Sequence, residues 1–110
     1  MTQIAVIGGG LMGHGIALTF ARAQYDVAVV EPIAHMRDSL PDRVRESLAL
    51  LGANADQITA AVSRIGTYES IPDAVRNADY VFEAAPEKLE LKQALFTEIE
   101  AHAPKDAILA

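Results

Sequence analysis

The sequence contains no cysteine and no tryptophan, and aromatic residues make up only 5% of its 110 residues. Without cysteine, disulfide bonds, thiolate catalysis and cysteine-ligated metal sites are excluded within this chain. Histidine is also scarce. The three histidines, His14, His35 and His102, are scattered and lack the spacing of a metal-binding set. No Ser-His-Asp triad or pair of catalytic carboxylates stands out. The composition therefore directs attention away from catalysis and towards binding.

Basic residues are also few, with 9 Lys and Arg against 15 Asp and Glu and a net charge of −6. This balance argues against a nucleic-acid partner, which requires clustered positive charge. No apolar run approaches the roughly 18 residues of a membrane-spanning helix, and no basic amphipathic helix indicates a membrane surface. The first expected strand begins at Gln3 and leaves no room for a signal peptide. We therefore expect a cytoplasmic protein without a membrane partner.

Apolar runs of strand type alternate along the chain with segments of helical periodicity. Strands are expected at 3–7, 27–30, 64–67, 79–85 and 107–110, and helices at 11–24, 33–51 with a break before Pro41, 55–62, 70–77 and 87–101. Asn54, with Gln57 three residues on, is expected to cap the third of these helices, and Ser70 the fourth. This alternation predicts an α/β fold, a Rossmann-type doubly wound parallel sheet. No repeat or linker divides the chain, so residues 1–110 are expected to form one domain. We expect the sheet to be truncated after the strand that begins near Ala107.

The expected first strand is followed at once by glycines and then by a helix. Gly8, Gly10 and Gly13 fill a G-x-G-x-x-G pattern. The first glycine of this pattern allows a tight turn, the second lets the backbone approach a pyrophosphate, and the third lets the helix pack against the strand. The free N–H groups and the positive dipole end of the helix would hold phosphates. The pattern predicts a dinucleotide site, and a turn selected only for close packing is the alternative.

An acidic residue, Glu31, ends the second expected strand, 18 positions after Gly13. A carboxylate at this place accepts hydrogen bonds from ribose hydroxyls and repels a 2′-phosphate, and the next residue is Pro32 rather than an arginine. NAD is therefore favoured over NADP. Arg37 is the one candidate for a phosphate partner, although we expect it to be a solvated helix residue. The same acid suits FAD, so these residues alone leave a flavoprotein open.

Three further residues lie close to the expected site. His14 follows the glycines on the first helical turn, where a cation is disfavoured, and is expected to be partly exposed. Glu87 and Lys92 lie at the start of the helix after the fourth strand, near the carboxyl ends of the strands, where ligands bind. Their spacing alone favours an acid that complements the helix dipole and an exposed lysine over two cofactor contacts. Other acids are expected on solvated faces: Glu69, Glu98 and Glu100.

Three blocks of sequence, at 8–17, 29–31 and 83–92, together resemble the NAD-binding domain of L-3-hydroxyacyl-CoA dehydrogenases over essentially the whole chain. The third block is the most specific of them and disfavours the flavoprotein. The family also includes 3-hydroxybutyryl-CoA, carnitine and L-gulonate dehydrogenases and the lens protein lambda-crystallin. The resemblance implies an NAD-dependent oxidoreductase of fatty acid metabolism that converts an L-3-hydroxyacyl-CoA, or a related 3-hydroxy acid, to the 3-keto compound. A non-catalytic NAD-binding or structural protein is the alternative from another class.

The resemblance also implies roles for individual residues. It implies cofactor contacts by Gly8, Gly10, Leu11, Met12, Gly13, Glu31, Glu87 and Lys92. It further implies that Ser47 touches the CoA moiety of an acyl-CoA substrate. Family members that bind CoA carry a lysine seven positions beyond this serine, where this sequence has Asn54. The departure leaves a smaller, CoA-free hydroxy acid open as the substrate.

The catalytic residues of the family correspond to positions beyond Ala110. So does the helical C-terminal domain, through which family members form a homodimer. The resemblance therefore implies no catalytic residue within this chain, and His14, His35 and His102 do not correspond to the family's catalytic histidine. We expect residues 1–110 to bind NAD and to turn over no substrate by themselves.

Overall fold

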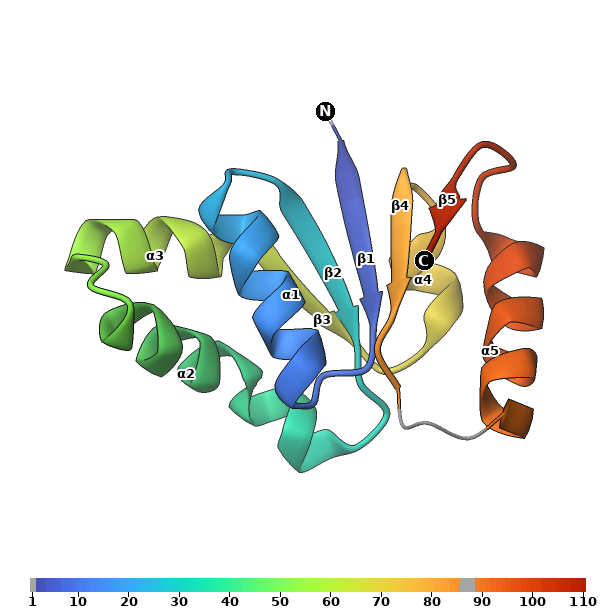
Figure 1. The fold of residues 1–110 in the computed structure, drawn as a ribbon, viewed down its shortest axis with the longest axis horizontal. Coiled ribbons are helices and arrows are strands. Elements are labelled where there is room, and N and C mark those ends of the chain that lie inside the picture. The colour runs from blue at the N-terminus through green and yellow to red at the C-terminus, as the bar shows by residue number, and fades with distance from the viewer. Residues whose placement is uncertain (1, 86–88) are drawn as a thin grey trace.

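The computed structural model describes residues 2–85 and 89–110 and shows one parallel sheet of five strands. The strands are β1 (Gln3–Ile7), β2 (Asp26–Val30), β3 (Ile65–Tyr68), β4 (Tyr80–Glu83) and β5 (Ile108–Leu109). The helices are α1 (Leu11–Arg22), α2 (Ala34–Leu50), α3 (Ala55–Ser63), α4 (Ile71–Val75) and α5 (Leu89–His102). The predicted α/β fold with a doubly wound parallel sheet is confirmed (Figure 1).

Both faces of the sheet are covered, and each has its own hydrophobic core. Alternate residues of β1 point to opposite faces, so that Ile4 and Val6 belong to one core and Ala5 and Ile7 to the other. Helices α1, α2 and α3 contribute to the first core, and α4 and α5 to the second (Figure 1). This double cover explains why the central strands are continuous apolar runs instead of alternating polar and apolar residues.

The central strand β1 is the place where the order of the strands reverses. The sheet has the order β3-β2-β1-β4-β5, so the chain builds outward from β1 on one side and then crosses to its other side. The register pairs Ile7 with Val30 of β2 and with Glu83 of β4, which brings the carboxyl ends of the three strands level. In open parallel sheets, ligands bind outside the carboxyl ends of the strands at such a switch point.

Helix α2 differs from the sequence prediction, because it continues through Pro41 without a break. Leu40, Val44 and Leu48 are all buried in the first core and lie on one face of the helix, on both sides of the proline. A proline within a helix removes one backbone hydrogen bond and crowds the preceding turn. Burial of this apolar face outweighs that penalty, and the prediction of a break was wrong.

The helix starts show which caps were predicted correctly. Asn54 forms the expected capping box at the start of α3: its Oδ1 accepts from the Gln57 amide, and its own amide donates to Gln57 Oε1, both at 2.9 Å. Ser70 also occupies the predicted N-cap position of α4, but its side chain makes no capping hydrogen bond. Caps of this kind depend on residues three apart, so the sequence indicates them directly.

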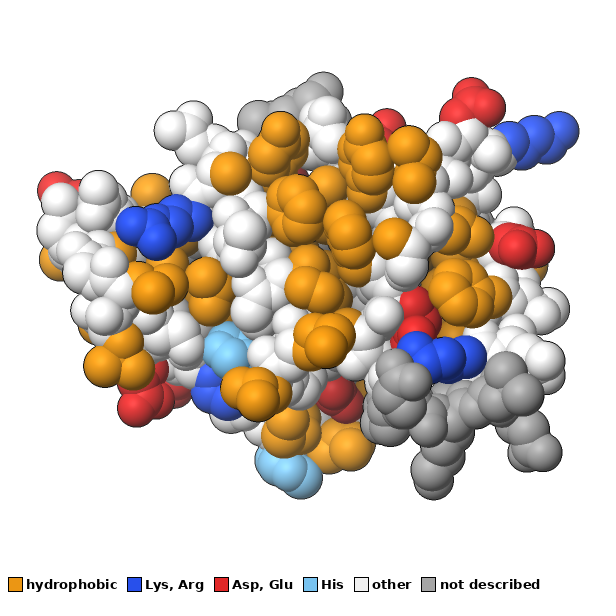
Figure 2. Space-filling view, in the orientation of Figure 1, with side chains coloured by type: hydrophobic (Ala, Val, Ile, Leu, Met, Phe, Trp, Pro, Cys, Tyr) orange, Lys and Arg blue, Asp and Glu red, His pale blue; other side chains and the backbone are white. Residues whose placement is uncertain are grey.

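Figure 2 shows the surface of the face that Figure 1 displays. Hydrophobic side chains gather along the middle of this view, whereas Lys and Arg side chains are scattered singly around it. The described basic residues on this face thus form no continuous stripe of the kind that follows a nucleic-acid backbone. Across residues 2–85 and 89–110, no helix combines the length and the apolar character needed to cross a bilayer.

Candidate functional site

Two glycines of the loop between β1 and α1 are required by the protein's own packing. Gly8 has a positive φ of 109°, and a Cβ atom on it would lie 2.9 Å from the carbonyl oxygen of Ala84. A Cβ atom on Gly13 would lie only 1.8 Å from the carbonyl oxygen of Gly8. The predicted roles of Gly8 in the turn and of Gly13 in close helix packing are therefore confirmed.

Gly10 is different, because among the described residues a Cβ atom on it would meet no atom within 4 Å outside its own chain neighbours and helix. Gly10 is the N-cap of α1 in an extended conformation open to any residue, and no described side chain caps this helix start. The first N–H groups of α1 therefore remain available to an anion. The neighbouring Leu11 and Met12 are strongly exposed, at 86% and 69%. This open, uncapped helix start fits the phosphates of a dinucleotide.

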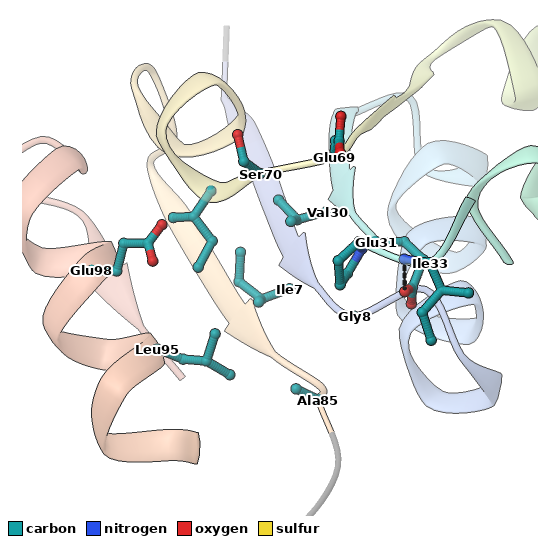
Figure 3. A pocket seen from close by; sticks show the side chains of 12 residues that line it. Ile7, Gly8, Val30, Glu31, Ile33, Glu69, Ser70, Ala85, Leu95 and Glu98 are labelled. Carbon is teal, nitrogen blue, oxygen red and sulfur yellow. Dashed lines mark hydrogen bonds between the residues drawn. The ribbon is translucent and has the colours of Figure 1, made fainter. Parts of the chain in front are cut away.

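Glu31 directly follows β2 and is held in one orientation by the backbone. Its side chain is buried, and its Oε1 accepts from the Gly9 amide at 2.9 Å. Its Oε2 accepts from the Ile33 amide at 2.9 Å (Figure 3). Each carboxylate oxygen has a second lone pair that is free to accept a hydroxyl hydrogen bond. The predicted ribose-binding acid is thus fixed beside the glycine loop.

A cavity of about 440 Å³ opens beside Glu31 at the carboxyl ends of β1 and β2 (Figure 3). Ile7, Val30 and Leu95 contribute apolar side chains to its lining. Glu69 and Glu98 also line it, one before α4 and the other on α5. Both are exposed, as predicted, but sequence reasoning missed that the fold brings them to the same cavity as Glu31. Nothing in their local sequence signals this.

Arg37 of α2 is docked against the main chain that precedes its helix. Its Nη1 donates to the carbonyl oxygen of Glu31 at 2.9 Å and lies 3.5 Å from that of Pro32. Arg37 is partly buried and its guanidinium donates to the backbone, so it is not the freely solvated helix residue that was predicted. The contact ties the start of α2 to the end of β2, next to Glu31, the acid predicted to select the cofactor.

A second cavity, of about 510 Å³, adjoins the first, since Gly8 and Glu31 line both. It also includes Gly10, Met12, Glu83 and Lys92. The Glu83 side chain is only 2% exposed, accepts from the Ala85 amide at 2.7 Å and forms an ion pair with Lys92. Lys92 is therefore anchored at the cavity and is not the simple exposed lysine that spacing favoured. Sequence reasoning missed Glu83, although an acid at the end of a buried strand is itself a signal, since a buried charge needs a partner.

Glu87, the other predicted contact on this segment, lies outside the described residues. Its predicted role therefore stays a prediction.

His14 lies on α1, is buried beneath α2 and contacts the predicted substrate residue Ser47. Its Nε2 lies 3.0 Å from the Ser47 hydroxyl, and its Nδ1 is buried without a hydrogen-bond partner among the described residues. The prediction that His14 is partly exposed was wrong, because α2 packs over it. His35 lines the second cavity and is exposed, and His102 is exposed at the end of α5. Within the described part of the chain, no cluster of three or more His, Asp or Glu side chains could hold a metal.

An α/β domain with this loop and this acid at its switch point is a dinucleotide-binding domain. Its family follows from comparison with known proteins: the model of the 3-hydroxyacyl-CoA dehydrogenase NAD-binding domain matches residues 3–110. The chain belongs to this family, and its cofactor is NAD.

Individual relatives agree with this assignment. A probable 3-hydroxyacyl-CoA dehydrogenase of Caenorhabditis elegans is 32% identical over 115 residues, which cover 97% of this chain and 39% of the relative. An L-carnitine dehydrogenase/betainyl-CoA thioesterase of Agrobacterium fabrum is 34% identical over 108 residues, which cover 98% of this chain and 22% of the relative.

The structure of 3-hydroxybutyryl-CoA dehydrogenase from Escherichia coli K12 superposes with a TM-score of 0.88 at 31% identity, covering 98% of this chain and 24% of that one. The chain thus spans less than two fifths of the length of each of these three proteins.

Proposed function

We propose that this chain is the cofactor-binding part of a dehydrogenase that oxidises an L-3-hydroxyacyl-CoA, or a related 3-hydroxy acid, to the 3-keto compound. The observation that carries the proposal is the loop from Gly8 to Gly13, whose Gly10 is open to a ligand while Gly8 and Gly13 are required by packing. Family membership supplies the reaction class. NAD accepts a hydride when bound, and the residues of this chain bind and orient it.

The proposed contacts divide along the cofactor. The N–H groups at the start of α1, beside Gly10, Leu11 and Met12, hold the diphosphate, and Glu31 accepts hydrogen bonds from the adenosine ribose. Lys92, anchored by Glu83 in the second cavity, faces the part of the cofactor beyond the glycine loop. This division is based on the two neighbouring cavities, which share Gly8 and Glu31 and of which only the second includes Lys92.

The acid–base step is proposed to lie outside these 110 residues. Two histidines lie near the site. His14 is buried, with its ring within hydrogen-bond distance of the Ser47 hydroxyl, and His35 is exposed on α2. The chain's contribution is therefore binding and orientation. A homodimer, formed through a further helical domain, is proposed for the complete protein because the family resemblance implies one.

A CoA-free hydroxy acid is the second candidate substrate. The observation that favours it is that Asn54 stands where CoA-binding family members carry a lysine. Asn54 has no charge, and its side chain caps α3. The similarity to L-carnitine dehydrogenases of several bacteria points the same way. If Ser47 contacts an acyl-CoA, it does so with a hydroxyl that also bonds to His14.

The first experiment measures NADH binding and substrate turnover with the 110-residue chain. We expect NADH to bind, and we expect no reduction of NAD with 3-hydroxybutyryl-CoA or L-carnitine. Measurable turnover would contradict the placement of the acid–base step outside this chain. In the complete protein, the same two substrates distinguish the candidates, because a CoA-dependent enzyme is expected to reduce NAD only with the thioester.

A further inference from the structure

We propose that Glu69 and Glu98 are specificity-determining residues that, together with Glu31, exclude a phosphate on the adenosine ribose. The inference rests on the placement of the adenosine beside Glu31 that is part of the proposed function. It goes further, because it assigns cofactor choice to two acids that lie far from Glu31 in the sequence.

The three carboxylates line one cavity from three different elements. Glu31 follows β2, Glu69 lies between β3 and α4, and Glu98 projects from α5 towards the cavity (Figure 3). Apolar side chains, among them Val30 and Leu95, separate them. A nucleoside that enters this cavity therefore meets an apolar lining with acidic groups on several sides.

No described residue that lines this cavity is a lysine, an arginine or a histidine. Arg37 follows Glu31 by six positions, but its guanidinium donates to the Glu31 carbonyl oxygen. Glu31 itself is held by the Gly9 and Ile33 amides and cannot swing away. A phosphate that entered here would meet three glutamates and no cation among the described residues that line this cavity, since His35 and Lys92 line the second cavity.

The chemistry of the ribose makes this arrangement selective. A 2′-hydroxyl is neutral and donates a hydrogen bond, which a carboxylate accepts. A 2′-phosphate carries about 1.5 to 2 negative charges at pH 7, so the Glu31 carboxylate repels it. Repulsion between like charges acts across several ångströms in a partly enclosed apolar cavity, so Glu69 and Glu98 oppose the phosphate without touching the ribose.

The test compares two adenosine probes on the 110-residue chain, 5′-AMP and adenosine 2′,5′-bisphosphate, by calorimetric or NMR titration. The variant is Glu69→Gln/Glu98→Gln. The matched control is Glu46→Gln/Glu100→Gln, which removes the same charge from two exposed acids that do not line the cavity. Circular dichroism melting establishes that each variant is folded.

We expect Glu69→Gln/Glu98→Gln to raise the affinity for the bisphosphate by about five- to tenfold at low salt. Affinity for 5′-AMP is expected to stay within about twofold, and the gain is expected to shrink at about 0.5 M salt because exposed charges are screened. The control is expected to change the bisphosphate affinity by less than about twofold, since its carboxylates lie outside the cavity. An equal gain in the control, or no gain in the variant, overturns the inference.

A third variant separates this inference from the proposed function. Glu31→Gln is expected to weaken 5′-AMP binding, because the ribose loses its charged acceptor. If it does not, the placement of the adenosine fails. If it does, and the Glu69→Gln/Glu98→Gln variant still discriminates against the bisphosphate as the unchanged chain does, the inference alone fails.

Discussion

Gly13 and Gly10 form a matched pair, because alanine at each position adds the same methyl group to the same loop with opposite consequences. At Gly13 the added Cβ would lie 1.8 Å from the Gly8 carbonyl oxygen, far inside the 3.4 Å at which ordinary contact begins. That oxygen belongs to backbone, and the Gly8 amide is itself bonded to Val30 at 2.8 Å. No side-chain rotation relieves the overlap, so α1 must move away from the sheet.

The magnitudes follow from these contacts. Overpacking a close-packed core costs about 1–3 kcal/mol, and a clash between a Cβ and fixed backbone lies at or above the upper end. For Gly13→Ala we expect a loss of about 3 kcal/mol or more, from a total of about 5–15 kcal/mol. The midpoint of thermal unfolding is then expected to fall by about 10 °C or more. Gly10→Ala meets no described residue outside its own helix and changes an N-cap, which costs less than about 1 kcal/mol.

The assay has two parts. Thermal or urea unfolding without cofactor, followed by circular dichroism, reports stability, and calorimetric titration with NADH reports binding. Gly10→Ala is expected to keep its midpoint within a few degrees but to bind NADH at least about tenfold more weakly, because its methyl group blocks the approach of the diphosphate. Unchanged NADH affinity in Gly10→Ala, or equal destabilisation of both variants, would refute the reasoning.

Two further predictions concern buried features of the site and the fold. Lys92→Met leaves the buried Glu83 carboxylate without this ion pair and is expected to lower the free energy of urea unfolding by about 3 kcal/mol. Lys92→Met/Glu83→Gln is expected to recover part of that loss, and a double variant no more stable than the single one would contradict the buried charge as its cause. Pro41→Ala restores a backbone donor within α2 and is expected to raise the unfolding free energy by about 1–3 kcal/mol. A decrease in stability would show that the proline fits its helix better than alanine.

Much of the fold was predictable because its signals are local. A strand, a glycine turn and the following helix lie within about twenty residues, and the roles of Gly8 and Gly13 follow from the close approach that this unit requires. The capping box at Asn54 depends on a partner three positions away. Glu31 was found in the same manner, since the spacing from the glycines to the end of β2 is set by one helix and one turn.

Predictions failed where neighbours from distant elements decided the outcome. The break before Pro41 is absent because Leu40 and Val44 are buried against α1 and the sheet, a contribution that helix propensity does not contain. His14 is buried because α2 packs over it and Ser47 bonds to its ring, 33 positions along the chain. Local sequence rules consider a residue only within its own helix. For Pro41 and His14, contacts with other elements determined the outcome.

The sequence by itself determined the class of the protein, because strand, turn and acid recur at spacings that the backbone geometry of one βαβ unit imposes. Only the tertiary structure decided what surrounds the cofactor. The strand order, which reverses at β1, brings Glu83 and Lys92 to one cavity and Glu69 and Glu98 to a neighbouring one, and both cavities include Gly8 and Glu31. Such groupings depend on which strands are neighbours, and spacing along the chain does not encode that order.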